Sequence, residues 1–209
     1  LDLNGQSISN LLTINSTGLS SGGAIINSST TAATASGNIT LGSNSSIGGS
    51  NNFTLSGIID DGVNTYTLTK VGTSNISLTG ATTYGGETSI TGGTLTLAGS
   101  GTLGNNTSLL TISSATLDIQ NGALTVGSLV MNGTSPSITR STGTSSLTVS
   151  GTATLANAIT TSSTQTYSGA TTLGSATTLT TTDSNVTFNG TLNSDGGTAR
   201  DLTLALGTG

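Results

Sequence analysis

The chain has 209 residues, of which 5% are charged and 2% are aromatic, and its formal net charge is −5. An ordinary soluble domain carries roughly 25% charged residues, so solubility here must rest on Ser, Thr, Asn and Gly. Because Lys70, Arg140 and Arg200 are the only basic side chains, the composition excludes a basic surface for phosphates, and we expect neither nucleic acid nor an anionic membrane as a partner.

The missing residue types exclude several kinds of chemistry. There is no Cys, so a disulfide framework and a thiolate site are excluded. There is no His, so the many Ser and Thr hydroxyls lack the usual base of a catalytic triad, and zinc and iron lose their commonest ligands. We therefore expect no cofactor, no metal site and no enzymatic activity.

Short alternating phrases return along the chain and predict strands with one buried face. In chain order they are FTLSG from Phe53, YTLTK from Tyr66, ISLTG from Ile76, LTLAG from Leu95 and SLTVSG from Ser146. The turn signals between strands are Asp61-Gly62, Gly85-Gly86, Gly92-Gly93, Asn121-Gly122, Asn132-Gly133 and Asn189-Gly190. No window shows a sustained 3.6-residue period, so we expect essentially no helix.

The spacing of the strands predicts a β-solenoid. Phrases of about five residues return every 8 to 12 residues, and longer units return at roughly 20 to 25. A tandem β-sandwich would need bulky aromatic cores, whereas stacked coils need only small aliphatic side chains and Ser, Thr and Asn ladders. We predict one continuous, elongated all-β solenoid over residues 1–209, with about nine coils and a length of about 40 to 45 Å. The polar stretch from Ser28 to Gly37 is expected to loop outward.

Both ends of the sequence read as strands without a polar cap. The chain begins LDLNG and ends DLTLALGTG, and a terminal coil exposes unpaired backbone groups. We expect the chain to be a segment of a longer repeat protein or a subunit that stacks end to end on copies of itself. The stacking candidates are Leu1, Leu3, Leu202, Leu204 and Leu206.

The stretch from Leu68 to Leu95 resembles the β-strand repeat of bacterial autotransporter passengers. The residues that match are Leu68-Thr69-Lys70, Gly72, Ile76-Ser77-Leu78-Thr79-Gly80, Tyr84, Gly86, Thr88, Ile90, Gly93 and Leu95. The sequence departs from the pattern at Ser74, Thr82 and Glu87. A second stretch, from Thr164 to Leu192, is similar to repeats of filamentous-haemagglutinin-like adhesins. The resemblance implies a right-handed parallel β-helix that is secreted by a Gram-negative type V route and displayed at the cell surface.

The acidic residues offer few candidates for a catalytic or calcium site. Asp60-Asp61 is the only adjacent pair, and Asp-Asp-Gly before a strand predicts a turn in which the carboxylates accept backbone N–H bonds. Gly196-Gly197 with Asp201 lacks the spacing of a calcium nonapeptide. The isolated acids are expected to be solvated turn residues: Glu87, Asp118, Asp183, Asp195 and Asp201.

We therefore interpret the chain as a non-enzymatic extracellular rod or adhesin segment, with a host surface, a neighbouring cell or a glycan as further partners. One alternative is a β-helical enzyme acting on polysaccharide, which would need carboxylates stacked from several coils. Another is an ice- or glycan-binding module, which would need a flat, regular Thr face or an aromatic strip; the Thr patterns look irregular in the sequence. The aromatic residues are expected to serve packing: Phe53, Tyr66, Tyr84, Tyr167 and Phe188.

Overall fold

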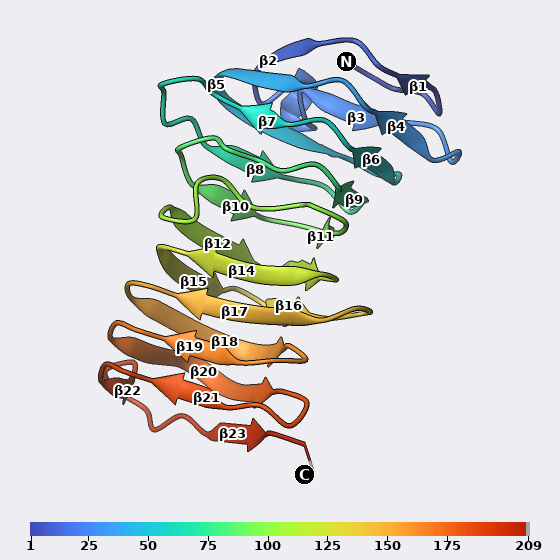
Figure 1. Cartoon of the computed structure of the whole chain (residues 1–209). Helices are drawn as coiled ribbons and strands as arrows, with labels where there is room; N and C mark the ends of the chain where they lie inside the picture. The colour runs from blue at the N-terminus through green and yellow to red at the C-terminus, as the bar shows by residue number, and fades with distance from the viewer. Residues whose placement is uncertain (208–209) are drawn as a thin grey trace.

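The computed structural model describes residues 1–207 and is an all-β parallel β-solenoid of about nine turns (Figure 1). The described residues form 23 strands, and their one helical element is the short 3₁₀ turn η1 (Leu19–Ser21). The predicted β-solenoid and the expected lack of helix are therefore confirmed.

Each coil runs over three faces, which we name C, A and B in the order in which the chain visits them. Face C carries β3 (Ile25–Asn27), the second half of β5 (Ile39–Gly49), β8 (Leu68–Lys70), β10 (Thr88–Ile90), β12 (Leu109–Ser113), β15 (Ser128–Asn132), the first halves of β18 (Ala153–Thr160) and β20 (Thr171–Thr180), and β22 (Leu192–Ser194). Face A carries β1 (Ser7–Ile8), β4 (Ala33–Ala35), β6 (Phe53–Leu55), β9 (Asn75–Leu78), β11 (Thr94–Leu97), β13 (Thr116–Ile119), β16 (Ser137–Thr139), the second halves of β18 and β20, and β23 (Leu202–Ala205). Face B carries β2 (Leu12–Ser16), the first half of β5, β7 (Ile59–Asp60), β14 (Gly122–Val126), β17 (Ser145–Val149), β19 (Gln165–Tyr167) and β21 (Val186–Phe188).

The coils differ in length, although the faces stay in register. On face A, 19 residues separate Leu78 from its partner Leu97, whereas 27 separate Ser7 from its partner Thr34. The stretch from Ser28 to Gly37 does not loop outward as a whole, because its centre forms β4 and turns Ala33 and Ala35 into the core. The prediction of an outward loop was therefore wrong there, since alanine in an alternating pattern fits a narrow interior.

Small aliphatic side chains stack into continuous ranks inside the solenoid. On face A the inward rank is Ala33, Phe53, Ile76, Leu95, Leu117, Ile138, Ile159 and Leu179. On face C it is Ile25, Ile47, Lys70, Ile90, Ile112, Met131, Leu155 and Leu173. The predicted thin aliphatic core is therefore present, and it includes one lysine.

Glycines stack at two corners because neighbouring coils approach closely there. A methyl group built on Gly57 would lie 2.1 Å from the carbonyl oxygen of Gly37 in the preceding coil. At a second corner, a methyl group on Gly169 would lie 2.4 Å from the carbonyl oxygen of Gly151. Real side chains do not tolerate such distances, so the glycine that ends phrases such as LSG, VSG and YSG is required by stacking.

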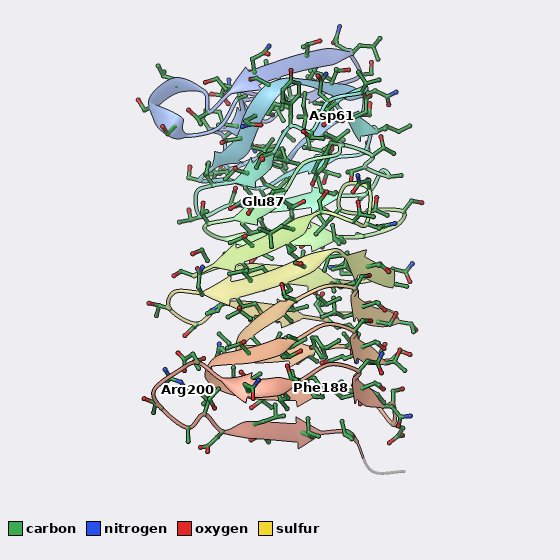
Figure 2. All side chains as sticks on the ribbon, turned by 90° about the vertical axis from the view of Figure 1, so that its left-hand side faces the viewer. Asp61, Glu87, Phe188 and Arg200 are labelled. Carbon is green, nitrogen blue, oxygen red and sulfur yellow. The ribbon has the colours of Figure 1, made fainter. Side chains whose placement is uncertain are left out.

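The coils stack along one axis, and Figures 1 and 2 show a body that is longer along this axis than it is wide. The accessible surface is 8700 Å² for a mass of 20.2 kDa. A globular monomer of this mass is expected to expose about 8,750 Å². The expected elongated shape is therefore present, although the tightly stacked coils expose no more surface than a globular protein of this mass.

Candidate binding face

A nearly continuous rank of hydroxyl side chains runs along the outside of face A, one residue in each coil. Its members are Ser7, Thr34, Thr54, Ser77, Thr96, Asp118, Thr139, Thr160 and Thr180. We call these residues the hydroxyl rank. Six of the nine are half-buried, as expected for the outer surface of a sheet, while Ser7 in the first coil is exposed and Thr96 and Asp118 are buried. The Thr pattern is thus more regular in space than in the sequence.

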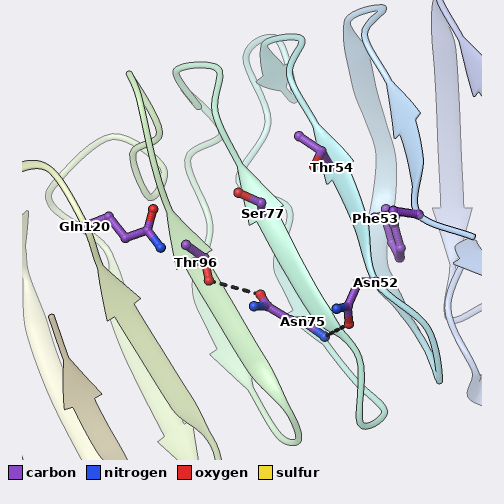
Figure 3. A pocket seen from close by; sticks show the side chains of 8 residues that line it. Asn52, Phe53, Thr54, Asn75, Ser77, Thr96 and Gln120 are labelled. Carbon is purple, nitrogen blue, oxygen red and sulfur yellow. Dashed lines mark hydrogen bonds between the residues drawn. The ribbon is translucent and has the colours of Figure 1, made fainter. Parts of the chain in front are cut away.

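Two asparagines lie beside the hydroxyl rank in successive coils (Figure 3). Oδ1 of Asn52 accepts a hydrogen bond of 2.8 Å from the backbone N–H of Asn75. Oδ1 of Asn75 accepts one of 3.0 Å from the hydroxyl of Thr96 in the following coil. Each amide oxygen is therefore committed to the next coil, and this fixes the orientation of both amide groups.

A shallow depression of about 180 Å³ lies over these asparagines on face A. It is lined by Ala32, Asn52, Phe53, Thr54, Asn75, Ser77, Thr96 and Gln120. Figure 3 shows the polar side chains of four successive coils along it. None of the lining residues carries a charge, so the depression presents amides and hydroxyls.

Asp118 is buried by its own hydrogen bonds although it faces outward. Its carboxylate accepts hydrogen bonds from the backbone N–H of Ser141 at 2.8 Å and from the Ser141 hydroxyl at 2.6 Å. It also accepts one of 3.0 Å from Nε2 of Gln120. The sequence placed Asp118 among solvated turn residues, and this was wrong, since strand β13 holds it in the hydroxyl rank against the turn of the next coil.

The adjacent acids Asp60 and Asp61 are both held by hydrogen bonds at the end of β7. Asp60 accepts a hydrogen bond from the N–H of Gly62, and buried Asp61 accepts one from Tyr66 at 2.8 Å and one from Gly85 at 3.1 Å, so the predicted turn role is confirmed. Figure 2 shows Asp61 and Glu87 at different places along the stack. Within residues 1–207, no three His, Cys, Asp or Glu side chains gather into a group that could hold a metal ion.

The three basic side chains are each engaged by separate contacts and do not share a site. Lys70 is 1% exposed, and its ammonium group donates hydrogen bonds of 2.9 to 3.0 Å to the carbonyl oxygens of Val71, Gly72 and Gly92. Burial lowers the pKa of Lys70 to about 8, because the charged form is poorly solvated there. The burial of Lys70 was not predicted. The sequence does indicate it, because Leu68 and Lys70 alternate with Thr69 and so share the inward side.

The two arginines are held by local contacts. Arg140 donates a hydrogen bond of 2.7 Å from its guanidinium to the carbonyl oxygen of Gly143. Arg200 makes a bidentate ion pair with Asp195, with distances of 2.8 and 3.0 Å, and its hydrogen bond lowers the pKa of the Asp195 carboxyl. The loop with Gly196 and Gly197 is therefore closed by an ion pair.

The aromatic residues pack inside the solenoid, as predicted. Tyr84, Tyr167 and Phe53 are buried, and the hydroxyl of Tyr84 is 2.6 Å from that of Thr88. Tyr167 stacks on Phe188 with ring centroids 5.0 Å apart. Tyr66 and Phe188 are partly buried against the core. None of the five forms an exposed strip for stacking on sugar rings.

The stacking candidates lie in the first and the last described coils. Leu1 is 58% exposed and Leu204 is 48% exposed, whereas Leu3 is buried at 3%. Leu202 is partly buried against the core. The last coil has strands β22 and β23, and within residues 1–207 no strand of face B follows β21. Two copies stacked end to end through these coils would therefore leave a gap of one strand on face B.

Within the described residues, no helix is both long and apolar enough to cross a membrane. Comparison with protein-family models, with curated protein sequences and with solved structures gave no match to this chain.

Proposed function

We propose that this chain is a non-enzymatic structural segment of an extracellular rod, secreted and displayed at the surface of a Gram-negative bacterium. The observation that supports the proposal most strongly is the stack of parallel coils, in which the strands of faces A and C form one continuous 19-stranded sheet over an aliphatic core. In such a stack each coil contacts only its neighbours, so added coils extend the rod without changing its cross-section.

The end coils supply the means of extension. β23 is paired on one side, with β20, and the adjacent side chains Leu202 and Leu204 are partly exposed. A parallel strand with one free edge and apolar side chains is a ready template for another strand. The partner in this proposal is a further coil, from the same precursor or from a second copy of the chain.

The proposal is tested by the association state at rising protein concentration. We expect the molar mass from light scattering to grow with concentration, because the end strands pair between copies. The double variant Leu202→Lys/Leu204→Lys should stay monomeric, since charged side chains on an edge strand block pairing. The matched control Ser146→Lys, on the outer side of face B, should associate like the unmodified chain. Equal association of the edge variant and the control would contradict stacking through β23.

A second candidate function follows from the hydroxyl rank. Strand geometry places its members about 4.8 Å apart along the solenoid, and outward residues two positions away in each strand lie about 6.6 Å across. A flat lattice of this kind is what an ice-binding surface requires. The rank is interrupted by Asp118, so this candidate predicts that Asp118→Thr strengthens inhibition of ice recrystallisation; no inhibition by either protein would eliminate it.

The alternative of a polysaccharide-degrading enzyme would need two carboxylates within about 5 to 10 Å of each other at an open site. The proposal of a structural role is favoured by the environments of the two buried acids, Asp61 and Asp118, since each carboxylate accepts at least two hydrogen bonds from the fold itself. Release of reducing sugar from pectate or cellulose by the purified chain would overturn the proposed function.

A further inference from the structure

The depression on face A presents hydrogen-bonding groups that the fold itself does not use. Oδ1 of Asn52 and Oδ1 of Asn75 are both engaged by the following coil. Each Nδ2 atom is left with two N–H donors and makes no hydrogen bond within residues 1–207. The two donor groups belong to adjacent coils and so lie about 4.8 Å apart in the direction of the solenoid axis.

The other end of the depression offers an acceptor. Nε2 of Gln120 donates to Asp118 and to the hydroxyl of Ser141, at 3.0 and 3.1 Å. This fixes the amide so that Oε1 is available as an acceptor, while the hydroxyl groups of Thr54 and Ser77 lie between the ends. The polar side chains of the lining span four coils, or about 14 Å.

The chemistry of the lining selects the class of ligand. A charged ligand would need an opposite charge in the site, and the depression has none. The net charge of −5 also repels acidic glycans. A neutral sugar chain offers hydroxyl groups that both donate and accept at short intervals, which complements amide donors, hydroxyls and an amide acceptor in a row.

We propose that the depression formed by Asn52, Thr54, Asn75, Ser77 and Gln120 binds a neutral oligosaccharide that lies along the solenoid axis. This site would give the rod of the proposed function an adhesive specificity. It depends on face A alone and does not require the end coils to stack.

Isosteric variants separate the role of the free donors from that of the fold. Asn52→Asp/Asn75→Asp keeps both oxygens that accept hydrogen bonds from the next coil and replaces only the projecting NH₂ groups. The matched control is Asn44→Asp, because Oδ1 of Asn44 accepts the N–H of Thr67 at 2.9 Å in the same manner outside the depression. Ser77→Gln is a third variant, which fills the depression with a neutral side chain and leaves both asparagines unchanged.

The experiment measures binding of maltohexaose, cellohexaose, chitohexaose and hexagalacturonate by saturation-transfer NMR and calorimetry. We expect at least one neutral hexasaccharide to bind the unmodified chain and Asn44→Asp with the same Kd. The Asn52→Asp/Asn75→Asp and Ser77→Gln variants should bind it at least tenfold more weakly. The proposal is overturned by binding of hexagalacturonate alone, by no binding of any neutral probe, or by equal affinity in all four proteins. Monomers that bind sugar would support this site even if end-to-end stacking failed.

Discussion

Replacing Lys70 by Met tests how the core tolerates a charge. Lys70 occupies the inward rank of face C between Ile47 and Ile90, where Met fits by size and polarity. The substitution removes the donor for three carbonyl oxygens, those of Val71, Gly72 and Gly92. At about 1 kcal/mol or slightly more for each unsatisfied carbonyl, the loss is about 3 to 4 kcal/mol.

The ammonium group carries an opposing cost. Its pKa is lowered from 10.5 to about 8, and a shift of this size corresponds to about 3 kcal/mol against the charged form. Near pH 7 the two effects nearly cancel, so we expect Lys70→Met to be less stable by only about 1 kcal/mol. The unfolded chain keeps its proton up to about pH 10, so the stability of the unmodified protein rises between pH 8 and pH 10, whereas the variant lacks this rise.

The measurement is urea denaturation of both proteins at pH 7 and at pH 9.5, with circular dichroism as the signal. The free-energy difference should widen by about 2 kcal/mol at the higher pH. Above pH 10 the buried hydroxyls of Tyr84 and Tyr167 lower the stability of both proteins as the pH rises, because burial raises the pKa of each tyrosine and the unfolded chain ionises first. A difference that stays constant with pH would refute the reasoning, since Lys70 would then be solvated in the folded state.

Three further predictions follow from the packing. Gly169→Ala should lower the free energy of unfolding, measured by urea denaturation, by about 3 kcal/mol or more, because the new methyl group would lie 2.4 Å from the carbonyl oxygen of Gly151. Gly196→Ala is the control, since a methyl group there would meet nothing within 4 Å. Equal effects of the two substitutions would argue against corner stacking. Trypsin should cut the native protein after Arg200 and Arg140 but not after buried Lys70, as mass spectrometry of the digest would show; early cleavage after Lys70 would mean that this corner opens readily. Gln165→Leu should lower stability by about 1 to 3 kcal/mol in thermal or urea denaturation, because the buried hydroxyl of Tyr167 loses its acceptor, whereas the carbonyl of Thr180 keeps the backbone N–H of Thr161. No loss would show that water replaces the amide.

The strands and the solenoid could be predicted because alternation survives in each short phrase. ISLTG and LTLAG place Ile76, Leu78, Leu95 and Leu97 on the buried side, and the structure pairs them as neighbours in successive coils. The glycines that end FTLSG, ISLTG and SLTVSG could be read from the sequence, but not the reason for them. The reason is the carbonyl of the preceding coil, which is a contact between residues about 20 apart and is not visible in a single coil.

The binding face could not be predicted because its register depends on the length of every coil. Neighbouring residues of the hydroxyl rank are 19 to 27 residues apart in the sequence, and stacking aligns them on face A. The bond from Asn75 to Asn52 likewise joins residues 23 apart. The burial of Lys70 could not be predicted for another reason. Lysine is almost never fully buried, so its charge argues against an inward position even where the alternation of the strand indicates one.

Electron microscopy across a concentration series tests the central claim most directly, that stacked coils of this chain build an extracellular rod. The account predicts particles of constant width whose length grows with concentration in steps of about 43 to 48 Å, the height of nine to ten coils. Averaged images should show a spacing of about 4.8 Å along the axis. Particles that keep one length at every concentration would contradict assembly by stacking, and compact particles without the axial spacing would contradict the solenoid itself.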